Sequence, residues 1–163
     1  MQTNIIDNKA DRLFTVIYSK SDKETIVLLH GGPGFPSDLT EIVNSLKDSF
    51  QVITFHQRGT EKSPCASKDY SMEAYLCDLE AIRKFYQIDK FHLWGHSWGG
   101  LYAQIYDEKY ADNLLSLFLC SPGSGTNTQW KQTEKEVMQL NKSKTTGWEW
   151  TKMGMNSFLG ILG

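Results

Sequence analysis

Apolar residues in the first 120 positions form short continuous runs separated by stretches of helical periodicity. Continuous apolar runs of this length are typical of strands in the buried part of a sheet. They lie at 25–30, 51–56, 91–94 and 114–120. Between them, apolar residues recur at the spacing of one helix face. The predicted helices lie at 39–46, at 72–86 with Ser71 as N-cap, and at 99–110.

This alternation of strands and helices predicts an α/β fold with a mostly parallel sheet and flanking helices. A further strand is predicted at 12–19, paired with 3–7. In parallel sheets, ligands bind beyond the carboxyl ends of the strands. We therefore expect the functional residues to lie in the loops that follow the apolar runs.

The pattern changes after residue 122. A loop, SPGSGTNTQ, leads into a polar helix predicted at 129–142, and the tail carries apolar residues at helical spacing from Met155 to Leu162. We expect part of an α/β core at 1–122 and the beginning of a helical cap at 123–163. Because the tail pattern reaches the last residue without a stop signal, we interpret the chain as incomplete, with C-terminal strands missing. The strand at 114–120 would then be an exposed edge, through which two copies are expected to dimerise.

Composition narrows the classes of function. The chain has 163 residues, 40% of them apolar, a net charge of −2 and a pI near 6.1, so no basic surface for nucleic acid is expected. Its apolar runs are too short for a membrane span, and its N-terminus lacks a signal-peptide pattern. The three cysteines have no metal-like spacing. We expect a cytoplasmic protein with no metal and no cofactor.

The sequence Gly95-His96-Ser97-Trp98-Gly99 lies between a predicted strand and a predicted helix. A serine on such a tight turn projects above the sheet, and the flanking glycines relieve crowding of the backbone. The N–H groups that open the next helix point toward a developing oxyanion. We predict that Ser97 is a nucleophile; the alternative is an ordinary glycine-rich turn with an unreactive serine.

A second glycine-rich motif, HGGPG at 30–34, directly follows the first buried strand. Adjacent glycines let a backbone N–H turn toward a reacting carbonyl oxygen. Gly32, or alternatively Gly31, would donate this hydrogen bond together with the N–H of Trp98, and Pro33 would shape the turn. Without the serine motif, an ordinary Gly-Pro turn would explain these residues equally well.

A third motif, FHQRGTEKS, follows the second buried strand. We expect Arg58 to brace this loop through backbone carbonyls; the alternative is pairing with a carboxylate. Taken in order, HGGPG, QRGT with Ser63 three residues later, and GHSWGG resemble the proline iminopeptidase-like group of the α/β-hydrolase superfamily.

This resemblance covers residues 10–163 of the chain. These residues resemble the N-terminal half of the proteins in the group, and the resemblance ends within their cap region. It implies an incomplete α/β-hydrolase-type sheet, Ser97 as nucleophile, and Gly32 and Trp98 as oxyanion donors. It also implies cleavage of an N-terminal residue, often proline, from short peptides. The chain has His56 where the group usually has aspartate, and Glu61 where it has glycine, which affects the expected peptide specificity.

A catalytic base for Ser97 is not evident. In this superfamily the acid and the histidine of the triad follow the serine, but no histidine follows Ser97 here. Of the four that precede it, His96 is expected to point away from Ser97 and His92 to be a satisfied core residue. His30 and His56 end strands near the same rim and are explained equally well by packing and loop bonding.

The interpretation is a serine hydrolase that cleaves small peptides or esters through an acyl-enzyme at Ser97, from which the triad acid and histidine are missing. Such a chain would be nearly inactive alone. Two alternatives remain open: an esterase or lactonase on the same scaffold, and a truncated, non-catalytic binding or interaction protein.

Overall fold

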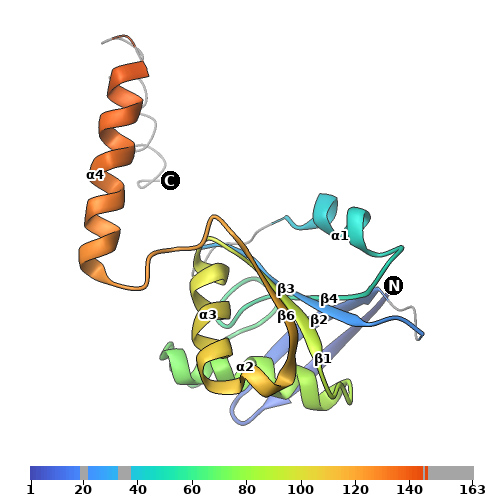
Figure 1. The fold of residues 1–163 in the computed structure, drawn as a ribbon. Helices are drawn as coiled ribbons and strands as arrows, with labels where there is room; N and C mark the ends of the chain where they lie inside the picture. The colour runs from blue at the N-terminus through green and yellow to red at the C-terminus, as the bar shows by residue number, and fades with distance from the viewer. Residues whose placement is uncertain (19–21, 33–37, 145, 147–163) are drawn as a thin grey trace. The chain divides into compact units, whose positions relative to one another are not determined.

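The computed structural model describes residues 1–18, 22–32, 38–144 and 146, and the chain divides into two compact units, Met1–Gly123 and Ser124–Gly163 (Figure 1). The strands of the first unit are β1 (Gln2–Asn8), β2 (Asp11–Tyr18), β3 (Thr25–Leu29), β4 (Gln51–Phe55), β5 (Phe91–His96) and β6 (Leu114–Cys120). Its helices are α1 (Thr40–Leu46), α2 (Met72–Phe85), α3 (Trp98–Tyr110) and a short 3-10 helix (Ala111–Asn113).

Within the described residues, the strands form one six-stranded sheet in the order β1-β2-β4-β3-β5-β6. The four strands from β3 to β6 are parallel to their neighbours, whereas β2 pairs antiparallel with both β1 and β4. The predicted α/β architecture and the predicted pairing of the first two strands are therefore confirmed.

Burial explains why the central strands have no polar face. Every residue of β3 is buried, because α2 and α3 pack on one face of the sheet and α1 on the other (Figure 1). Alternate β3 residues such as Val27 and Leu29 join the cluster with α2 and α3, while Ile26 and Leu28 join the cluster with Val43 of α1. The Ser71 hydroxyl accepts a hydrogen bond from the Ala74 N–H, which confirms the predicted cap of α2.

β6 is the last strand of this sheet among the described residues, as the sequence predicted. Its pairing with β5 leaves its other side open, and Leu115 and Phe118 are 44% and 59% exposed. An apolar edge of this kind is a template for pairing with another strand.

The second unit contains α4 (Asn127–Lys144), which is longer at both ends than the predicted helix at 129–142. The apolar positions from Met155 to Leu162 lie outside the described residues. Within the described part of the chain, no helix combines the length and the apolar character needed to cross a bilayer.

Candidate functional site

Ser97 lies on a sharp turn between β5 and α3, with φ 52° and ψ −117°. Positive φ is unfavourable for a residue with a side chain, so the surroundings must hold this conformation. The Ser97 N–H donates to the Cys120 carbonyl at 3.1 Å, and the Ser97 carbonyl accepts from the N–H groups of Gly100 at 2.9 Å and Gly123 at 2.8 Å. The ends of three elements therefore fix the turn.

The glycines on either side of Ser97 are required by close backbone contacts. A Cβ atom on Gly95 would lie 2.4 Å from the Gly99 carbonyl oxygen, and one on Gly99 would lie 2.2 Å from the Leu29 carbonyl oxygen. Both distances are far below van der Waals contact. A side chain at either position would force the backbone to shift, so glycine fits this tight turn at both positions, as expected for a strand-to-helix turn that presents a serine.

The turn after β3 lies directly beside the elbow. A Cβ atom on Gly31 would be 3.1 Å from the Cβ of Ser97 and 3.0 Å from Nδ1 of His96, and Gly32 has a φ of 64°. The structure thus brings the two glycine motifs together, although they are separated by more than sixty positions. Pro33 lies outside the described residues.

Trp98 is the first residue of α3, so its backbone N–H has no acceptor within the helix. Its ring packs edge-on against Tyr75 of α2, with 5.7 Å between the ring centroids. This contact holds the start of α3, and with it the Trp98 N–H that follows Ser97, against the core.

Arg58 braces the loop after β4, as the sequence predicted. The guanidinium donates to the backbone carbonyls of Asp69 at 2.6 Å and Ala74 at 2.9 Å, and it also forms a two-pronged contact with the Asp78 carboxylate at 2.8 Å. A contact of 3.3 Å to Asp11 completes the network. Both predicted alternatives therefore occur together. Burial raises the pKa of Asp78, and the bonds from Arg58 oppose this rise.

The two residues that depart from the family pattern contact each other. His56 Nδ1 lies 2.9 Å from Glu61 Oε2 and 3.2 Å from the Lys62 N–H. Burial lowers the pKa of His56, with Glu61 opposing and Lys62 adding to this effect. The ring of His56 also packs on Phe14 at 4.9 Å. These contacts account for His56 as a loop residue.

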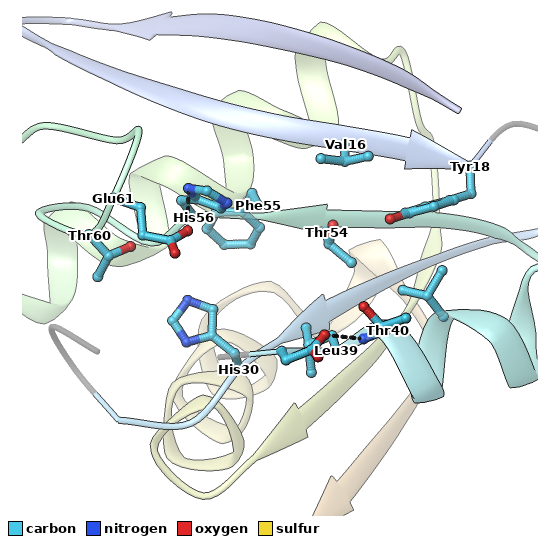
Figure 2. A pocket seen from close by; sticks show the side chains of 12 residues that line it. Val16, Tyr18, His30, Leu39, Thr40, Thr54, Phe55, His56, Thr60 and Glu61 are labelled. Carbon is cyan, nitrogen blue, oxygen red and sulfur yellow. Dashed lines mark hydrogen bonds and ion pairs between the residues drawn. The ribbon is translucent and has the colours of Figure 1, made fainter. Parts of the chain in front are cut away.

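A cavity of about 190 Å³ lies between β2, β4 and α1, and Figure 2 shows His56 and Glu61 at one end of it and His30 below them. Its described lining is Val16, Tyr18, His30, Asp38, Leu39, Thr40, Val43, Thr54, Phe55, His56, Thr60 and Glu61. His30, which lines the cavity, directly precedes Gly31, and its Nδ1 lies 2.9 Å from the Gly31 carbonyl oxygen. Residue patterns did not predict this cavity, since its walls come from four separate segments.

No hydrogen bond joins the Ser97 hydroxyl to a histidine or a carboxylate among the described residues. His30 is buried, and burial lowers its pKa, so it is neutral at pH 7. His96 is exposed and stacks on Trp94 at 6.3 Å. His92 is not the core residue that was expected: it lies at the start of β5, partly exposed, and bonds to Ser116 and Glu24. Its place beside the sheet edge explains the difference.

Comparison with known proteins agrees with this geometry. A proline iminopeptidase from Lactobacillus helveticus (strain DPC 4571) is 32% identical over 133 residues, which are 78% of this chain and 45% of that protein. The enzyme from Lactobacillus delbrueckii subsp. lactis is 29% identical over 147 residues, covering 81% and 50%. The chain therefore spans about half the length of the curated relatives it matches.

Solved structures show the same fold. Proline iminopeptidase from Mycobacterium smegmatis superposes with a TM-score of 0.79 at 16% identity, over 99% of this chain and 56% of that one. VinJ superposes with a TM-score of 0.75 at 20% identity, over 85% and 49%. Residues 24–148 match the family described as having the alpha/beta hydrolase fold. Because this match covers most of the chain, the protein belongs to the alpha/beta hydrolase family.

Proposed function

We propose that the protein is a serine hydrolase that cleaves amide or ester bonds through an acyl-enzyme at Ser97, with short peptides as the first substrate class to test. The observation that carries the proposal is the strained backbone of Ser97, held at φ 52° beside the Gly31–Gly32 turn. Strain of this kind is retained where it serves to expose a reacting group. The similarity to proline iminopeptidases supports the peptide class.

In the proposed reaction, Ser97 Oγ attacks the substrate carbonyl. The negative charge that develops on the carbonyl oxygen is stabilised by the N–H groups of Trp98 and Gly32, with Gly31 as the alternative donor. Gly95, His96 and Gly99 shape the elbow beneath the substrate. Residues 123–163 would be the beginning of a helical cap domain.

The hydroxyl proton needs an acceptor, and no histidine follows Ser97 in the 163 residues. Loss of a triad member lowers the rate by about four powers of ten. We therefore expect residues 1–163 alone to turn over substrate very slowly, and an acid and a base from outside them to be needed for full activity.

A fluorophosphonate probe tests this proposal directly. We expect slow labelling that peptide mapping assigns to Ser97, faster labelling when imidazole is added as an external base, and loss of this label in Ser97→Ala. Ser45→Ala is the matched control, because Ser45 is an exposed serine that bonds only a backbone carbonyl. Absence of label on Ser97 with imidazole present would favour the non-catalytic alternative.

The esterase or lactonase alternative is distinguished by substrate. If the chain, with imidazole added as an external base, hydrolyses aryl esters or lactones but leaves a prolyl anilide unchanged, the proposal would move from peptides to esters. The fold and the elbow are compatible with both leaving groups.

Association of two copies through β6 is a further part of the proposal. The open side of β6 and the exposed side chains of Leu115 and Phe118 support it. Sedimentation velocity at rising concentration should show a dimer that Leu117→Pro on the same strand weakens. A monomer at every concentration would contradict this part alone.

A further inference from the structure

Three polar side chains meet at the amino end of β5, far from the elbow. His92 Nδ1 lies 2.8 Å from Ser116 Oγ, and His92 Nε2 lies 3.1 Å from Glu24 Oε2. His92 is the second residue of β5, Ser116 is its partner in the register of β6, and Glu24 precedes β3. Ser97 is five positions further along the chain than His92, which is about 16 Å along a strand.

The contact with Glu24 sets the tautomer of the neutral imidazole ring. An ionised carboxylate can only accept hydrogen bonds, so Nε2 must carry the proton that bonds to Glu24. In a neutral ring Nδ1 then has the lone pair, and the Ser116 hydroxyl must donate to it. The Ser116 proton is therefore directed at a base whose other nitrogen is bonded to a carboxylate, which is the relation that activates a serine nucleophile.

The ring is held in this orientation by its neighbours. Phe50 packs against His92 edge-on, with centroids 5.3 Å apart and planes at 78°. The Glu24 carbonyl accepts from the Gln51 N–H at 3.0 Å, which anchors the backbone that carries the carboxylate. The pairing of His92 with Ser116 between β5 and β6 positions Ser116, the third member of the cluster. Each member of the cluster is thus positioned by a separate contact.

The cluster is also accessible to a reagent. Ser116 is exposed, 19% of the His92 side chain is exposed, and 66% of the Glu24 side chain is exposed. The hydroxyl can therefore meet a small acyl donor in solution. The exposure of Glu24 means that its charge is partly screened, so its contribution is expected to be smaller than that of His92.

We propose that Ser116, His92 and Glu24 form a second nucleophilic site that accepts acyl groups from small activated esters, independently of Ser97. Ser116 Oγ attacks the ester carbonyl while its proton passes to His92 Nδ1. The bond between the carbonyl carbon and the leaving oxygen breaks, the imidazolium returns the proton to that oxygen, and the acyl group remains on Ser116 as an ester. Glu24 stabilises the imidazolium.

The test uses p-nitrophenyl acetate on the Ser97→Ala chain, with peptide mapping of acetylated serines. We expect acetyl-Ser116 to form at least about 100-fold faster than acetyl-Ser45, in line with general-base assistance. His92→Gln should remove this advantage, and Glu24→Gln should lower it about tenfold. Equal rates at Ser116 and Ser45 would overturn the proposal, as would an unchanged rate at Ser116 in His92→Gln.

Attack by the imidazole itself is a distinct outcome. If Ser97→Ala/Ser116→Ala releases p-nitrophenol as fast as Ser97→Ala while His92→Gln does not, the histidine is the nucleophile and the proposal is wrong. Nitrogen chemical shifts of His92 give a second measurement without reagent. A neutral ring protonated at Nε2 is expected, and protonation at Nδ1 would overturn the proposal. Because Ser97 is absent from these samples, their result is separate from that of the proposed function.

Discussion

β5 carries a different chemical arrangement at each end. At its carboxyl end, Ser97 has a strained backbone and neighbouring N–H groups but no base among the described residues. At its amino end, Ser116 has a base and a carboxylate in ordinary strand geometry. The first site is built from the backbone and the second from side chains.

The two ends also differ in what holds them. The carboxyl end rests on buried contacts: the pair between Arg58, in the loop after β4, and Asp78 of α2, and glycines packed against backbone. The amino end depends on partly exposed hydrogen bonds. We therefore expect substitutions at the carboxyl end to change the stability of the fold, and substitutions at the amino end to change reactivity with little effect on stability.

The largest effect is expected for Arg58→Met. Removing the guanidinium leaves Asp78 buried without its charged partner, which should lower the free energy of unfolding by about 3–5 kcal/mol. Lys109→Met is the control, because it breaks an exposed pair with Glu73 and should change little. Urea unfolding curves measure both. A small loss of unfolding free energy for Arg58→Met would show that the loop after β4 does not stabilise the carboxyl end of β5.

Gly99→Ala tests the backbone contact beneath the elbow. The added Cβ would lie 2.2 Å from the Leu29 carbonyl oxygen, so β3 and α3 must move apart. We expect a loss of about 1–3 kcal/mol in unfolding free energy. Gly123→Ala adds a Cβ no closer than 3.5 Å to its neighbours and serves as the control. Equal stability of the two variants would contradict the close approach.

The pH dependence of stability should report His30 at the carboxyl end. Burial lowers the pKa of His30 in the folded protein, so as pH falls below about 6.5 the unfolded chain binds a proton that the folded chain does not. Stability is therefore lost as pH falls through this window. Urea unfolding from pH 8 to pH 5 should show a shallower loss for His30→Asn than for the parent chain. Identical slopes for His30→Asn and the parent chain would show that folding does not lower the pKa of His30.

The smallest effect on stability is expected for Glu24→Gln at the amino end. Exposed ion pairs contribute less than about 1 kcal/mol, and Glu24 is largely exposed. The same variant is expected to slow acetylation of Ser116 about tenfold. If Glu24→Gln lowered the free energy of unfolding in proportion to its loss of reactivity, the contrast between the two ends of β5 would be contradicted.

Much of the fold could be predicted from residue patterns. The apolar runs identified β3 to β6, because strands buried on both faces, such as β3, leave a continuous apolar signal. The edge strand β6 is also apolar along its length and was predicted with the bounds Leu114–Cys120 that the structure has. Ser71 was recognised as a cap because capping chemistry is local in sequence. Gly95 relieves crowding within its own turn, against the Gly99 carbonyl oxygen, whereas the close contact at Gly99 is with Leu29 of β3, about 70 positions earlier in the chain.

The tertiary structure decided three arrangements. It places Gly31 beside Ser97, it builds the network around Arg58, and it brings together Glu24, His92 and Ser116. His92 illustrates the reason. Its sequence context is an apolar strand, which predicted a core residue, but strand order places it beside the edge strand and its register places it opposite Ser116. Local patterns determine which residues form strands and turns, whereas strand order and register, which depend on contacts between distant segments, determine which side chains meet.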